Sequence, residues 1–213
     1  MAGKVKKPVV TAAAVSLAAF FALLSLSLYF ELGRIEEVKK GLTAIDNLWN
    51  DARLLLEFSD NPDCEALIRE NFALGDRIYA EGLRVEKYEK ANILTTTLFL
   101  ERKRYTLLDL QFWKNSVKIR ELCNASYSTV VFFYSYFNRT IEQRVFDSVM
   151  WEVKQRCGPN IIYITMPADL GISTVNLLMK KYNVTRVPAV LVNESVVIER
   201  PLPVSEFTRL LGC

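Results

Sequence analysis

The first feature of the chain is a long apolar run over residues 8–30 that contains no charged residue. As a helix it reaches about 34 Å, more than the roughly 30 Å hydrocarbon core of a bilayer. A cleaved signal peptide has a shorter apolar region and a small-residue cleavage site, whereas this run ends in Tyr29 and Phe30 and is followed by Glu31. The pattern therefore predicts an uncleaved, single-pass signal-anchor helix over residues 8–30, preceded by a short tail over residues 1–7.

Two apolar stripes follow the anchor at helical spacing. The first steps by three and four residues through Ile35, Val38, Leu42, Ile45, Trp49, Ala52 and Leu56. The second lies in a long predicted helix, residues 85–122, and runs through Leu94, Leu98, Tyr105, Leu108, Phe112, Ile119 and Leu122. We expect the two stripes to pack as an antiparallel helical hairpin, a stalk over residues 31–125. Packing of either stripe on the C-terminal domain or on another protein stays open.

Between these stripes the sequence predicts a short helix and an irregular segment rather than one long helix. Asn61 and Pro62 are typical of a helix start and open a short helix through Phe72. Gly75 and Gly82 then bracket a piece that we expect to be irregular. Further on, Glu101 and Asn115 interrupt the second stripe. We expect the charged residues 101–104 to form a solvated face, with a partner surface as the alternative.

From residue 126 onward the pattern changes to short apolar runs separated by amphipathic segments. The predicted strands are 129–134, 161–165, 189–192 and 195–199, and the predicted helices are 139–156, 173–182 and 204–211. The helix 139–156 carries one apolar face, made of Ile141, Val145, Phe146, Val149 and Val153. The order is β-α-β-α-β-β-α, an α/β domain over residues 126–213 whose first two strands are joined by a helical crossover and are expected to be parallel.

Charge predicts which way the anchor faces and excludes several functions. The chain of 213 residues has 27 Lys and Arg against 24 Asp and Glu, and Lys4, Lys6 and Lys7 account for the excess. Basic flanks stay on the cytoplasmic side, so we expect a cytoplasmic N-terminus at the cell membrane and an extracytoplasmic segment over residues 31–213. That segment is neutral, which gives no electrostatic case for a nucleic-acid partner.

Histidine is absent, which excludes a Ser-His triad, a Cys-His pair and a His-ligated metal. No carboxylate pair or phosphate-binding glycine loop stands out, so we predict neither a cofactor nor a metal. Glutamine is scarce while Glu, Lys and Arg are abundant, a composition that hints at a thermophilic source.

Cysteines and glycosylation motifs all follow the anchor. The four cysteines are Cys64, Cys123, Cys157 and Cys213. On the outer side of a membrane they favour disulfides, and three pairings are possible from the sequence. Four Asn-x-Ser/Thr motifs begin at Asn124, Asn138, Asn183 and Asn193, which predicts a glycoprotein.

The C-terminal element order and the segment 180–192 together resemble the thioredoxin-like superfamily. Lys180-Lys-Tyr-Asn-Val-Thr-Arg-Val-Pro-Ala-Val-Leu-Val192 is similar to the end of that family's second helix, its turn and the Val-Pro element before the third core strand. The resemblance implies that Pro188 is cis. It also places the family's active-site C-x-x-C at Asn138-Arg-Thr-Ile141, where no cysteine occurs. Thiol–disulfide exchange at that position is therefore not expected.

The resemblance implies two further features. Helices 139–156 and 204–211 would lie on one sheet face, which would bring Cys157 to Cys213 and leave Cys64 to pair with Cys123. The family's groove beside the cis proline, which holds extended peptides in relatives, would be lined here by Tyr134, Tyr136, Phe137, Val187 and Pro188.

We therefore expect a non-catalytic accessory or scaffolding subunit of a membrane complex that acts on exported polypeptides, of which an oligosaccharyltransferase-like assembly is one example. Its partners would be other membrane protein subunits, reached through the stalk and the membrane helix. A smooth helix face of Ala14, Ala18 and Ala22 either admits a second membrane helix or reflects how common alanine is in such spans. The alternative function is an extracytoplasmic thiol–disulfide oxidoreductase or chaperone that uses non-standard cysteines. A self-associating stalk is a third possibility.

Overall fold

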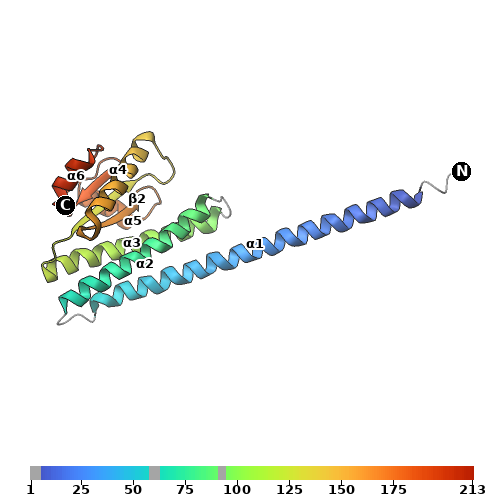
Figure 1. Ribbon diagram of the computed structural model, residues 1–213, viewed down its shortest axis with the longest axis horizontal. Coiled ribbons are helices and arrows are strands. Elements are labelled where there is room, and N and C mark those ends of the chain that lie inside the picture. The colour runs from blue at the N-terminus through green and yellow to red at the C-terminus, as the bar shows by residue number, and fades with distance from the viewer. Residues whose placement is uncertain (1–5, 58–62, 91–94) are drawn as a thin grey trace. The chain divides into compact units, whose positions relative to one another are not determined.

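The computed structural model describes residues 6–57, 63–90 and 95–213. The chain forms two compact units, Met1–Thr43 and Ala44–Cys213. The longest helix, α1 (Lys6–Glu57), begins in the first unit and ends in the second (Figure 1).

The first unit contains a helical segment that is long and apolar enough to cross a membrane, Val10–Phe30, with a mean hydropathy of 2.0. Its large side chains are exposed rather than packed in a core; Phe20 and Phe21 are 57% and 58% exposed. An apolar surface of this kind suits a lipid environment better than water. Most of the predicted tail lies outside the described residues, which begin at Lys6.

Helices make up the N-terminal half of the second unit. They are the end of α1, α2 (Cys64–Lys90) and α3 (Thr95–Cys123). Asp63 caps α2, because its Oδ1 accepts hydrogen bonds from the N–H groups of Glu65 and Ala66 at 3.1 and 3.2 Å. The predicted helix start at Asn61 and Pro62 lies outside the described residues.

The predicted irregular piece around Gly75 and Gly82 is wrong, because both glycines lie inside α2. A Cβ atom on Gly75 would come within 2.7 Å of the Phe112 ring, and one on Gly82 would overlap the Tyr105 hydroxyl. Rings of α3 therefore occupy the space that larger residues would fill. Glycine disfavours a helix by about 1 kcal/mol relative to alanine, but close helix packing requires it here.

The helical hairpin also differs from the predicted one. Gly75 lies beside Phe112 and Gly82 beside Tyr105, so α2 and α3 are antiparallel. The single helix predicted for 85–122 is divided between the end of α2 and α3. The stripe on α1 runs parallel to α3, since Arg104 reaches Asp46 and Asn115 donates a hydrogen bond to the carbonyl of Ala52. The sequence pattern missed α2 as a full-length helix. It therefore placed α3 antiparallel to α1, whereas α3 is antiparallel to α2 and parallel to α1.

A mixed four-stranded sheet forms the C-terminal half and confirms the predicted α/β class. Its strands are β1 (Ser128–Tyr134), β2 (Ile161–Pro167), β3 (Ala189–Val192) and β4 (Val196–Ile198), in the order β2-β1-β3-β4. β1 is parallel to β2 and antiparallel to β3, and β3 is antiparallel to β4. The helices between and after these strands are α4 (Ile141–Cys157), α5 (Ser173–Lys181) and α6 (Val204–Leu211).

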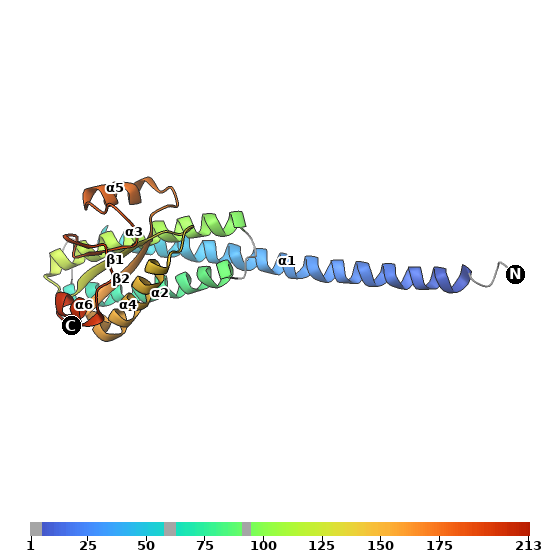
Figure 2. The ribbon, with the colours of Figure 1, turned by 90° about the horizontal axis from the view of Figure 1, so that it is seen from above.

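Alternate side chains of the strands supply two hydrophobic cores. On one face Phe132 packs with Phe146 of α4 and Phe207 of α6. On the opposite face Phe133 belongs to a cluster that includes Trp113 of α3. Figure 2 shows α3 and α5 on one side of the sheet and α4 and α6 on the other. Helices from 44–125 and the sheet from 126–213 therefore share one of these cores.

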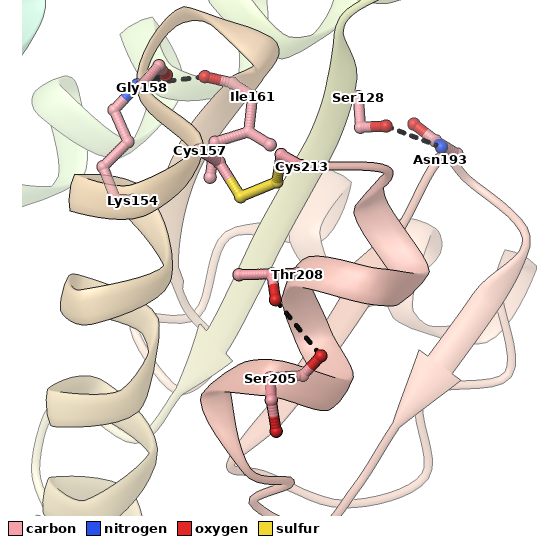
Figure 3. The surroundings of a disulfide bond; sticks show 9 residues. All are labelled: Ser128, Lys154, Cys157, Gly158, Ile161, Asn193, Ser205, Thr208 and Cys213. Atoms are coloured by element: carbon pink, nitrogen blue, oxygen red, sulfur yellow. Dashed lines mark hydrogen bonds between the residues drawn. A yellow bond between two sulfur atoms is a disulfide. The ribbon is translucent and has the colours of Figure 1, made fainter.

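Two disulfides engage all four cysteines, and they are the two pairs that the resemblance implies. Cys64–Cys123 joins the start of α2 to the end of α3. Cys157–Cys213 joins the end of α4 to the residue that follows α6 and Gly212 (Figure 3). Beside it, Lys154 donates hydrogen bonds to the carbonyl oxygens of Gly158 and Ile161, both at 3.0 Å. Each cross-link therefore holds the C-terminal end of a helix that packs on the sheet, α3 in one case and α4 in the other.

Candidate functional site

The loop between β1 and α4 is the region that the sequence singled out, and one carboxylate organises it. Asp169, which follows β2, accepts hydrogen bonds from Ser135 Oγ at 2.5 Å and from the backbone N–H groups of Tyr136 and Phe137 at 2.8 and 3.2 Å. Desolvation works to raise the pKa of Asp169, but these hydrogen bonds outweigh it and hold the pKa below its ordinary value. The loop is therefore built around an ionised carboxylate.

The first turn of α4 fixes the same loop from the other side. Thr140 caps the helix, its Oγ1 accepting from the N–H of Gln143 at 3.1 Å. The side-chain amide of Gln143 is buried and satisfies both backbone groups of Ser135: Oε1 accepts from the N–H at 3.0 Å and Nε2 donates to the carbonyl at 3.1 Å. Polar contacts hold this segment in one conformation.

Tyr136 connects this loop to the helical half of the unit. Its hydroxyl donates a hydrogen bond to Glu89 Oε1 at 3.0 Å, and Glu89 accepts two more from Arg102. The Arg102 guanidinium lies 5.9 Å from the centre of the Tyr136 ring. Burial disfavours the charge on Arg102, yet the hydrogen bonds to Glu89 and nearby negative groups raise its pKa, so it stays protonated. The inner side of the loop is thus occupied by α2 and α3.

The five residues predicted to line a groove differ in exposure. Tyr134 and Tyr136 are half-buried, Pro188 is buried, and Phe137 is 66% exposed. Burial raises the pKa of Tyr134 to about 12. Val187 is half-buried against the core under α3, and the Val187–Pro188 peptide bond is cis. Only Phe137 offers a largely open side chain.

The loop that carries Val187 lies beside the start of α4. The guanidinium of Arg186 forms a 2.7 Å ion pair with Glu142 in the first turn of α4. Within the described part of the chain, the backbone N–H and C=O of Val187 have no hydrogen-bond partner.

An exposed apolar strip leads away from this loop along α4. It consists of Phe137, Ile141 and Val145, which are 66%, 73% and 46% exposed. The predicted apolar face of this helix is therefore only partly buried: Phe146 and Val153 are in the core, but Ile141 and Val145 are not. Their four-residue spacing places them on one outward side of the helix. Sequence periodicity cannot tell an exposed apolar strip from a buried one.

The predicted solvated face at residues 101–104 is wrong for Glu101 and Arg102, while Arg104 is exposed as predicted. Glu101 is fully buried and bonds Arg84 at 2.7 Å, and Arg102 is 6% exposed. Lys103 and Arg104 do reach solvent to different degrees. Asp109 is buried too, and desolvation raises its pKa well above the ordinary value. A charge run looks alike in sequence whether it faces water or ion-pair partners on another helix.

The glycosylation candidates fall into two groups. All four asparagines, Asn193 included, are exposed, so exposure does not separate them. Asn193 is committed to the structure: its Oδ1 accepts from the N–H of Thr129 at 2.9 Å and its Nδ2 donates to Ser128 Oγ at 3.1 Å (Figure 3). The amide nitrogen that a glycan would occupy at Asn193 is already engaged.

A cavity of about 390 Å³ lies between α3, α5 and Trp49 of α1. Sequence reasoning did not find it, because its lining comes from three helices that are distant in the chain.

Comparison with known proteins gives this chain no family. No protein-family model matches it, and no curated protein matches it significantly.

Proposed function

We propose that residues 126–213 form a thioredoxin-like domain. The β2-β1-β3-β4 order supports this, as do the parallel β1–β2 pair joined through α4 and the antiparallel β3 and β4. The placement of α4 and α6 on one sheet face supports it further. A fold of this kind is compatible with many functions, so the argument for function rests on the site.

We further propose that the protein is a non-catalytic, membrane-anchored accessory subunit that binds other proteins in a complex acting on exported polypeptides. An oligosaccharyltransferase-like assembly is one complex of that kind. The observation that carries this proposal is the loop after β1. Where the resembled family has reactive thiols, this chain has a loop held by Asp169 that turns Phe137 and Ile141 outward.

The chemistry of this strip favours binding over catalysis. Aromatic and aliphatic side chains supply binding energy when a partner covers them, about 25 cal/mol per Å² of apolar surface. The free backbone groups of Val187 suit pairing with an extended segment, and Phe137 and Ile141 suit side-chain pockets of the same partner. All four cysteines are in disulfides, so exchange chemistry would first require one of them to open.

The segment Val10–Phe30 would tether this domain, with the N-terminus in the cytoplasm and the sheet domain outside. Basic residues before the segment and the disulfides after it support this orientation.

Site-specific photo-crosslinking tests the proposal. A photoreactive side chain placed at Phe137 or Ile141 in the full chain, expressed in its native membrane, should capture a specific partner polypeptide. The same group at Leu210, which is 44% exposed on α6, is the matched control and should not. Equal capture from all three positions, or none from any, would overturn the proposal. Labelling of thiols in the unreduced native protein would instead favour the oxidoreductase alternative.

A further inference from the structure

Two helices, α3 and α5, form the walls of the cavity of about 390 Å³. On α3 the lining residues Leu107, Gln111, Lys114 and Lys118 recur every three or four positions, so they form one stripe about 16 Å long. On α5 the lining residues Thr174, Leu178 and Lys181 form a second stripe of about 10 Å. Figure 2 shows these two helices on the same side of the sheet. We call this space the α3–α5 groove.

The floor of the α3–α5 groove is aromatic and firmly held. Trp113 is 4% exposed, and its ring centre lies 5.7 Å from that of Tyr182. The indole N–H of Trp113 donates to Glu194 Oε1 at 2.7 Å, so the ring presents its apolar surface to the groove without an unpaired donor. Trp49 contributes a third ring from α1. A rigid apolar floor between two helices is the usual seat for the apolar stripe of a third helix.

The rim of the α3–α5 groove is positively charged. Lys114 and Lys118 stand on the α3 wall and Lys181 on the α5 wall, and all three side chains are exposed. No carboxylate is among the lining residues. Glu194, which lies near Trp113, is already paired with Arg120. Lysines on both walls therefore face any occupant with uncompensated positive charge.

We propose that the α3–α5 groove binds an amphipathic helix of a partner protein, one whose apolar stripe is bordered by aspartate and glutamate. The apolar stripe would cover the aromatic floor, and the carboxylates would pair with lysines on both walls. This inference rests on the proposed accessory role in one respect, that the occupant is another protein. It concerns a surface separate from the Phe137 strip.

The tryptophans of the chain allow a direct binding measurement. Of the three tryptophans, Trp49 and Trp113 line the groove, whereas Trp151 is 52% exposed on α4. In the full chain carrying Trp151→Phe, held in neutral-lipid nanodiscs, the emission therefore reports the groove. The probe is a synthetic peptide of about 14 residues without Trp or Tyr, with leucines at helical spacing flanked by glutamates. A second peptide with lysine in place of every glutamate is its control.

The acidic peptide should shift the tryptophan emission, and added salt should weaken its binding. The K114E/K118E/K181E variant should bind it at least about tenfold more weakly. A K87E/R144E/R200E variant, which reverses three exposed charges elsewhere, should bind within about twofold of the unaltered chain.

Equal binding of the acidic and basic peptides, or unchanged binding in the groove variant, would overturn the inference. It would also fail if anionic vesicles produced the same shift, which would indicate a lipid site, or if the chain formed a dimer that the groove variant abolished. The test needs no native complex. If the acidic peptide fails to bind but Phe137 crosslinks a specific partner, the proposed function stands and the groove inference falls. If the peptide binds but Phe137 crosslinks nothing specific, only the proposed function falls.

Discussion

Arg102 of α3 forms an ion pair with Glu89 of α2 through two hydrogen bonds of 2.8 and 2.6 Å. The two side chains are only 8% and 11% exposed. The same carboxylate accepts the hydroxyl of Tyr136, so the pair connects two helices to the loop after β1. The candidate site is therefore supported by residues that come before the sheet domain in the chain.

Replacing Arg102 with methionine should destabilise the protein strongly. Glu89 would remain buried with its charge unpaired, which costs about 3–5 kcal/mol. Denaturant unfolding of the full chain in detergent measures this loss. In the R102M/E89M double variant both charges are gone, and most of the stability should return. Equal losses in the single and double variants would contradict the buried ion pair.

The contribution of Asp169 to the free energy of unfolding should depend on pH. Its pKa is lowered in the folded protein, since the loop hydrogen bonds outweigh desolvation. A lowered carboxyl pKa stabilises the fold above the unfolded pKa, near about 4, and the contribution is lost as the pH falls through the folded pKa. Because Asp169 is exposed and solvent screens its charge, Asp169→Asn should cost only about 0.5–1 kcal/mol at neutral pH. The difference between the two proteins should shrink below about pH 4, and a difference that does not change with pH would contradict the ionised carboxylate.

Gly75→Ala should destabilise the second unit although alanine is the better helix former. The added methyl group would press on the Phe112 ring, an overpacking cost of about 1–3 kcal/mol. The control Ala73→Gly, at an exposed position of the same helix, should cost about 1 kcal/mol from helix propensity alone. In the G75A/F112L variant the smaller leucine side chain replaces the Phe112 ring, and part of the lost stability should return. A stabilised G75A protein would show that the helices do not pack so closely.

Glycan mapping of the protein from its native host should separate the four motifs. If the segment after the anchor faces a glycosylating compartment, Asn124, Asn138 and Asn183 should carry glycans and Asn193 should not. The Asn193 amide bonds Ser128 and Thr129 across the sheet, so N193A should cost about 1–3 kcal/mol. A fully occupied Asn193 would contradict this network.

The sequence predicted the sheet half of the molecule well because each element there carries a local signal. The α6 helix and β3 begin and end where the pattern places them, and the other strands and helices of that half agree within a few residues. Short β-branched runs bounded by turn residues need little tertiary information. The apolar membrane-length helix has an equally local signal.

The helical half was harder to predict because its decisive contacts are long-range. In the sequence Gly82 suggests a helix break, but in the structure it makes room for the Tyr105 ring. Glu101 suggests a solvated position, but in the structure it accepts a hydrogen bond from Arg84. The candidate site shows the same division. Phe137 was predicted through the family resemblance, whereas Asp169 was missed because a lone aspartate in a loop carries no pattern.

The proposed accessory role requires that this chain works as part of a larger assembly. The most direct measurement is the mass of the particle that contains it after gentle solubilisation from the native membrane. We predict a particle heavier than the single chain with other polypeptides present. F137E/I141E should lower its mass through loss of a partner polypeptide, and the control L210E should not. Recovery of the unaltered protein alone, at the mass of one chain, would contradict the account.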